Sequence, residues 1–334
     1  MPAPLTQSKD KIAIFNDTDL SFAITAKIGF MNSHRPFHTL SPQRWWLHSA
    51  LQWLTLLALL SSPLRASPAA EPIGVFVSLL PQKQFVERIA GDAVKVQVMV
   101  RPGQSPATYD PTPQQMVELA LATAYFRIGA PFENVWMPKI QSSHPKLRIV
   151  DTRAGITLLP MSSPATSQGH DHGNPDPHIW TDPLLVKQQA ANIRDGLIAV
   201  IPGERARFEA GYTRFAAELD ALDAELRRLL AGKTERRFMV FHPAWGYLAR
   251  TYGLKQIPIE VEGKEPGPQA LARLIDRARA DGVRVIFVQK QFSRSAADAV
   301  ARAIGGEVVE LDPLAEDFIG NTRSAGQAIA RAMR

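Results

Sequence analysis

From Pro72 onward, the chain alternates between segments with the pattern of buried strands and segments with the pattern of amphipathic helices. Residues 73–80 form a continuous apolar run, and residues 94–100 alternate valine with other side chains, which is typical of strands. Shorter strand patterns follow at 124–129 and 147–150, and the helical patterns between them are at 84–89 and 113–122. Such a strand and helix alternation predicts an α/β fold with a parallel sheet covered by helices on both faces.

A second series with the same plan occupies the C-terminal part of the chain. Its predicted strands are residues 238–241, 283–288 and 308–311, and its predicted helices are residues 267–280, 296–304 and 322–334. Two sheets, and therefore two lobes, are expected.

Between the two series the sequence predicts two consecutive helices. The first covers residues 184–201. The second follows Pro202 and carries large apolar side chains at alternating spacings of four and three, ending before Gly232. A coiled coil has this spacing, but a long helix packed on its own protein is the favoured interpretation because the repeat is short.

The overall composition is that of a globular protein of two ordinary domains: 334 residues, 45% hydrophobic and 21% charged. The formal charge is +6, and residues 1–66 hold six Lys or Arg and three Asp or Glu, so the remainder has 32 basic and 29 acidic residues. Basic residues are scattered, with no dense run, so nucleic-acid binding is not expected.

Residues 45–60 form a short apolar segment that follows Arg35 and Arg44 and precedes a stretch of small residues at 66–70. This layout predicts a secretory signal peptide, cleaved after Ala66 or Ala69. An uncleaved membrane anchor is the alternative, although about 16 residues is short for a spanning helix. The sequence contains no cysteine, which excludes disulfides and thiolate ligands and predicts that no cysteine-linked lipid anchor is present.

Three strong metal ligands stand beside prolines at separate places in the chain: His178, His242 and Asp312. Two imidazoles and a carboxylate suit zinc. His242 and Asp312 directly follow predicted strands, where open α/β sheets bind ligands. Taken singly, each residue is more often a structural hydrogen bonder or a turn former.

The segments around these residues resemble the solute-binding subunits of bacterial zinc and manganese ABC importers. The matching blocks are residues 99–113, 176–183, 241–248, 262–266 and 311–314. The resemblance implies two parallel-sheet α/β lobes joined by a single long helix, with a metal site in the cleft between the lobes. The expected divisions are an N-terminal extension and signal peptide (1–69), an N-terminal lobe (70–202), the connecting helix (203–232) and a C-terminal lobe (233–334).

The resemblance also implies the ligand set. His178 would come from the N-terminal lobe, and His242 and Asp312 from the C-terminal lobe. An imidazole at His242 resembles the zinc subgroup, since manganese binders carry a carboxylate there. The family has a further histidine where this chain has Ala107. Water, Thr108 or a loop histidine could take that fourth place, or the protein could bind another solute.

Two further histidines, His170 and His172, flank an aspartate in a polar loop at 160–177. They are candidate auxiliary zinc ligands, and an inert solvated loop is the alternative. Trp180 and Trp245 stand close to two of the predicted ligands and are expected to pack in the core.

The expected function is that of a monomeric periplasmic protein that captures Zn²⁺ and delivers it to the permease of an ABC importer at the inner membrane. Binding needs neutral imidazoles, so affinity should fall with falling pH. A manganese or iron carrier, or an adhesin of the same fold, is the alternative. A zinc-dependent hydrolase is a weaker one, because the sequence has no His-Glu-x-x-His motif, so the protein is not expected to be an enzyme.

Overall fold

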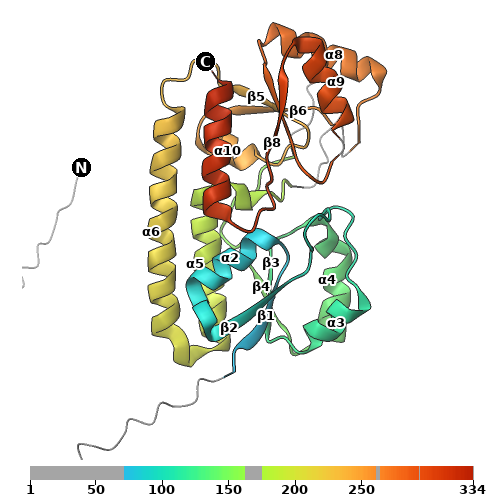
Figure 1. Cartoon of the computed structure of the whole chain (residues 1–334). Helices are drawn as coiled ribbons and strands as arrows, with labels where there is room; N and C mark the ends of the chain where they lie inside the picture. Colours follow the sequence, from blue (N-terminus) through green and yellow to red (C-terminus); the bar gives the residue numbers. More distant parts are fainter. Residues whose placement is uncertain (1–70, 162–174, 261–263, 293, 334) are drawn as a thin grey trace, which may run out of the picture. The chain divides into compact units, whose positions relative to one another are not determined.

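The computed structural model describes residues 71–161, 175–260, 264–292 and 294–333. The predicted signal segment, His170 and His172 lie outside these residues. Two four-stranded sheets with the same topology build two lobes (Figure 1). The strand orders are β2-β1-β3-β4 and β6-β5-β7-β8, and every strand pair is parallel. The predicted α/β fold with two parallel-sheet lobes is therefore confirmed.

The N-terminal lobe is formed by eight main elements. They are β1 (Ile73–Val77), α2 (Leu80–Ala90), β2 (Val94–Val98), α3 (Pro113–Ala120), β3 (Ala124–Arg127), α4 (Pro131–Ser143), β4 (Arg148–Asp151) and α5 (Pro183–Val200). Helix α4 was not predicted, because Pro138 lies inside it and a proline normally disfavours a helix interior.

The long helix α6 (Arg205–Leu230) follows, and then the elements of the C-terminal lobe. They are β5 (Arg237–Val240), α7 (Gly246–Thr251), β6 (Lys255–Pro258), α8 (Pro268–Ala280), β7 (Val285–Val288), α9 (Ser295–Ile304), β8 (Glu307–Glu310) and α10 (Phe318–Ala332). Helix α7, which has only six residues, was not predicted, and neither was strand β6. It ends in Pro258, and it stands at the edge of its sheet, where a missing backbone N–H is tolerated.

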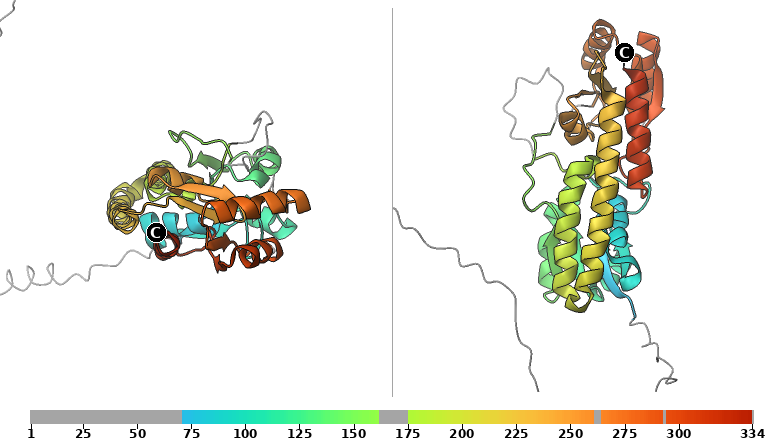
Figure 2. Two further views of the ribbon diagram at one scale, coloured as in Figure 1. Left: turned by 90° about the horizontal axis from the view of Figure 1, so that it is seen from above. Right: turned by 90° about the vertical axis from the view of Figure 1, so that its left-hand side faces the viewer.

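Helix α6 runs along both lobes and packs against helices of its own chain, namely α2, α5 and α10 (Figures 1 and 2). The four-three apolar spacing therefore belongs to a helix whose apolar face is buried against other helices of the same chain. Near the C-terminal end, Leu230 is buried and Leu229 is only half-buried, because a helix of 3.6 residues per turn drifts away from a strict seven-residue repeat.

One hydrophobic cluster extends through both lobes, from Phe76 and Phe126 in the first to Trp245, Phe287 and Leu311 in the second. A smaller cluster around Ile286 fills the other face of the second sheet. Trp180 and Trp245 are almost fully buried, as expected. None of the described helices has the length and apolarity needed to cross a membrane.

Candidate metal centre

The sheet register of the C-terminal lobe brings polar side chains to one edge. Val240, Pro258 and Phe287 are paired across β5, β6 and β7, so these parallel strands end side by side. The residues that follow the four strands of this sheet carry the chemistry of the site: His242, Glu260, Gln289 and Asp312. Carboxyl ends of strands in open α/β sheets are where ligands bind.

His242 is held by contacts on several sides. Its backbone N–H donates to Gln289 Oε1 (3.2 Å), and its carbonyl accepts from Gln289 Nε2 (2.7 Å). The Nδ1 atom donates to Glu260 Oε1 over 2.8 Å. The ring stacks on Phe292, with centroids 4.8 Å apart and an interplanar angle of 20°. These contacts fix the direction of the ring, and its Nε2 faces His178.

His178 comes from the other lobe and is held by its own carboxylate partner. Its backbone N–H and its Nδ1 both donate to Asp176 Oδ1, over 2.9 and 2.7 Å. The segment then forms a short turn that leads into α5, whose first turn is capped by Asp182, which accepts from Leu184 N. Proline at the start of α5 favours this helix start, and the short link to the helix holds the His178 segment in place.

The two imidazoles meet between the lobes. Their Nε2 atoms lie 3.2 Å apart, and the ring planes are inclined by 70°. In each ring the Nδ1–H bond to a carboxylate directs the Nε2 lone pair toward the other ring. In a tetrahedral zinc site with Zn–N bonds of 2.0–2.1 Å, two nitrogens are about 3.3 Å apart. The pair therefore has the separation of two ligands of one zinc ion.

Burial favours the neutral form of His242. Removal from water lowers the pKa of its imidazole, and the neighbouring His178 lowers it further, while the hydrogen bond to Glu260 raises it in part. A neutral imidazole is the form that ligates a metal.

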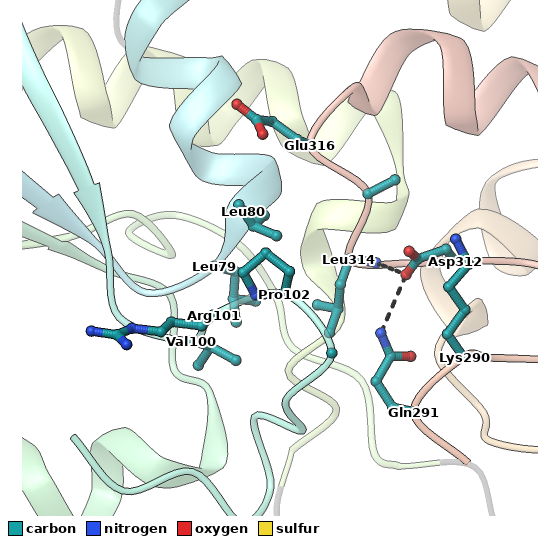
Figure 3. A pocket seen from close by; sticks show the side chains of 12 residues that line it. Leu79, Leu80, Val100, Arg101, Pro102, Lys290, Gln291, Asp312, Leu314 and Glu316 are labelled. Atoms are coloured by element: carbon teal, nitrogen blue, oxygen red, sulfur yellow. Dashed lines mark hydrogen bonds between the residues drawn. The ribbon is translucent and has the colours of Figure 1, made fainter. Parts of the chain in front are cut away.

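Asp312 does not join the two histidines in this structure. Its Oδ1 accepts from Leu314 N (2.9 Å) and from Gln291 Nε2 (3.5 Å). The side chain lines a pocket of about 220 Å³ together with Arg101, Lys290 and Glu316 (Figure 3). Among the residues that the structure describes, no three His, Asp or Glu side chains are grouped closely enough to hold a metal ion. Asp312 as a third ligand stays a prediction.

Ala107, which stands where the family has a histidine, is exposed. Ala107 and Thr108 both lie on the surface of the loop between β2 and α3, and the Ala107 N–H donates to Ser105 Oγ over 3.3 Å. Thr108 as a substitute ligand stays a prediction.

Asp176 and Glu260 were not assigned a role from the sequence. Asp176 lies in the family-like block 176–183, two residues before His178. This close spacing could have indicated that its carboxylate contacts the histidine. Glu260 follows strand β6, which was itself missed, so nothing in the sequence pattern pointed to it.

Comparison with known proteins gives a consistent result. Residues 75–332 match the family model of the zinc-uptake complex component A, periplasmic (ZnuA). The chain is 29% identical to the high-affinity zinc uptake system protein ZnuA of Bacillus subtilis over 259 residues, which cover 75% of this chain and 81% of that protein. It is 26% identical to the zinc-binding lipoprotein AdcA of Streptococcus pneumoniae, covering 76% of this chain and 52% of AdcA. This chain thus spans about half the length of AdcA.

Solved structures agree with the sequence comparison. A crystal structure of ZnuA is 42% identical, superposes with a TM-score of 0.74, and is matched over 78% of this chain and 99% of the other. A zinc-bound deletion mutant of ZnuA gives a TM-score of 0.73, also at 42% identity, over 78% of this chain and 98% of the other. With a family model that matches nearly all of the described chain, this protein belongs to the family of periplasmic A components of zinc-uptake complexes.

Proposed function

We propose that this protein captures Zn²⁺ outside the cytoplasm and delivers it to the permease of an ABC importer. The observation that carries the proposal is the pair of Nε2 atoms 3.2 Å apart, contributed by His178 and His242. Membership of the zinc-uptake family supports the same function. Imidazole ligands favour zinc over manganese, which prefers oxygen ligands, so manganese is the weaker alternative cargo.

In the proposed site each lobe supplies one imidazole, so a bound ion stabilises the arrangement in which the lobes are together. Asp312 is the proposed third ligand. To reach the ion, its carboxylate would leave the hydrogen bonds to Leu314 N and Gln291. Because Ala107 has no donor atom, we propose that water completes the coordination, which gives a more open site than four protein ligands would.

We propose a periplasmic location for a monomer, reached through a signal peptide in residues 1–69. AdcA is named a lipoprotein, whereas the present sequence has no cysteine to which a lipid could be attached. We therefore propose a protein without a cysteine-linked anchor. Proteins of this family are solute-binding transport proteins, and we propose no catalytic activity for this chain.

The test is a competition titration of the purified protein with Zn²⁺ and Mn²⁺, using a chromogenic chelator. We expect tighter binding of Zn²⁺ than of Mn²⁺. His178→Ala and His242→Ala should each weaken zinc binding roughly tenfold or more, since each removes a ligand. Ala107→His should tighten it, because a fourth protein ligand would replace water.

His144→Ala is the matched control, because His144 lies at the C-terminal end of α4, away from the pair. It should bind zinc like the wild type. Unchanged zinc affinity in both His178→Ala and His242→Ala would refute the proposed site.

A further inference from the structure

Two buried carboxylates stand behind the histidine pair, on the side away from the Nε2 atoms. Asp176 is 1% exposed and Glu260 is 4% exposed. Each bonds the Nδ1 atom of one imidazole with one oxygen. The other oxygens, Asp176 Oδ2 and Glu260 Oε2, are buried and have no hydrogen-bond partner among the described residues.

Such burial needs compensation. Removing a carboxylate from water is unfavourable unless a positive charge is close. Within the described residues neither Asp176 nor Glu260 has a Lys or Arg ion-pair partner, and their charged-group contacts are the imidazoles alone. Two negative charges thus lie behind two imidazoles, and a divalent ion between the Nε2 atoms would balance them.

The hydrogen bonds also determine which ring nitrogen carries the proton. A carboxylate accepts only, so each Nδ1 must be protonated to bond it, and each Nε2 is left with a lone pair. Ring orientation is fixed by the same bonds. In metal sites, a carboxylate that accepts from the non-ligating ring nitrogen raises the basicity of the ligand.

We propose that Asp176 and Glu260 are positioning residues that hold both imidazoles in the metal-binding tautomer and supply the charge that balances a divalent ion, without contacting the ion. This inference rests on the proposed function. Glu260 is the cleaner residue to test, because Asp176 also bonds the backbone N–H of His178, so its replacement would disturb the turn itself.

The first experiment measures zinc affinity and ring tautomer in Glu260→Gln. This substitution keeps the volume but removes the charge, and its amide can donate as well as accept. We expect the zinc Kd to rise about 10- to 100-fold. In the metal-free protein, two-bond ¹H–¹⁵N NMR spectra should show His242 as the Nδ1–H tautomer in the wild type and as a mixture in the variant. A merely structural role would not change the tautomer.

Glu133→Gln is the matched control. Glu133 is also fully buried, and its carboxylate bonds Ser78, Arg127, Ile128 N and Gly129 N but neither histidine. This variant should keep the wild-type zinc affinity and the wild-type tautomers, even if it is less stable. Circular dichroism would verify that both variants are folded.

Several outcomes would overturn the inference. One is a Kd for Glu260→Gln within twofold of the wild type, and another is weaker binding with the Nδ1–H tautomer fully retained. Zinc X-ray absorption spectra that lose an oxygen ligand in Glu260→Gln would make Glu260 a direct ligand instead. Failure of the wild type to bind zinc would refute the proposed function, whereas the tautomer measurement needs no metal and tests the positioning role separately.

Discussion

At the residue scale, the site depends on contacts that cross between the lobes as much as on the histidines. Tyr247, from α7 of the C-terminal lobe, donates its hydroxyl hydrogen to the Asp176 carbonyl over 2.7 Å and accepts from Leu159 N over 3.0 Å. Both partners belong to the segments that precede His178. Because Asp176 in turn orients His178, one tyrosine of the second lobe holds the imidazole of the first in place.

Tyr247→Phe should therefore destabilise the protein. The substitution leaves the buried Asp176 carbonyl and the part-buried Leu159 N–H without this partner, and an unsatisfied buried group costs about 1–3 kcal/mol. We expect the free energy of unfolding, measured by urea denaturation, to fall by at least about 1 kcal/mol, and zinc binding to weaken as well.

Tyr212→Phe is the control for this prediction. Tyr212 lies half-buried on α6 against Arg194, and its hydroxyl makes no hydrogen bond within the described residues, so its loss should change the unfolding free energy by less than about 0.5 kcal/mol. Equal effects of the two substitutions would contradict the role given to Tyr247.

The three proposed ligand residues show how far the sequence predicts the site at this scale. The block around His178 and the strand end before His242 were sufficient to predict that these two imidazoles converge. The position of Asp312 was predicted as well, but the direction of its carboxylate was not. That direction depends on the hydrogen bonds to Leu314 N and Gln291, which are tertiary contacts without a sequence pattern.

At the element scale, strands were predicted where burial imposes an apolar run, as in β1, β3 and β7. The six-residue helix α7 was missed because it is too short to show a helical repeat. The missed elements α4 and β6 each carry a proline, Pro138 and Pro258. Their tertiary positions make the proline tolerable: β6 stands at a sheet edge, and α4 is partly exposed along its length. The local sequence does not show that β6 lies at a sheet edge or that α4 is partly exposed, so neither proline could be recognised as tolerable.

Helix α6 packs so closely against α2 at Gly211 that a larger side chain does not fit there. A Cβ atom added to Gly211 would lie 2.1 Å from the carbonyl oxygen of Ile89, a backbone atom that cannot move without shifting α2. Gly211→Ala should therefore lower the free energy of unfolding by about 1–3 kcal/mol or more, although alanine has the higher helix propensity. Urea denaturation would measure this loss.

Gly203→Ala is the matched control, since a Cβ atom there has no heavy atom within 4 Å. It should be neutral or slightly stabilising, because alanine reduces the freedom of the unfolded chain. Equal stability of Gly211→Ala and Gly203→Ala would contradict the close packing of α6 against α2 at Gly211.

At the scale of the whole molecule, the two lobes are connected by more than the chain. Trp180 Nε1 donates to the Pro313 carbonyl over 2.8 Å, and the Thr181 hydroxyl hydrogen is shared between the Ala244 carbonyl at 3.2 Å and the His178 carbonyl at 2.9 Å. Both bonds between the lobes are buried and lie next to the histidine pair. Helix α6, whose 26 residues span about 39 Å at 1.5 Å per residue, packs against helices of both lobes.

These connections predict a small response to the cargo. Opening the lobes widely would break the Trp180 and Thr181 bonds and divide a hydrophobic cluster that is continuous across the lobes. We expect the free energy needed for this to exceed the binding free energy of one ion, so release of the ion should leave the lobes together. We therefore expect the radius of gyration, measured by small-angle X-ray scattering, to change by less than about 1 Å on zinc binding, as in other pre-organised complexes. Any change should be local, at the proposed ligand Asp312, whose carboxylate would exchange two hydrogen bonds for the ion. A contraction of several ångströms on adding zinc would instead mean that the lobes move as rigid bodies and that the bonds between them form only when the ion is bound.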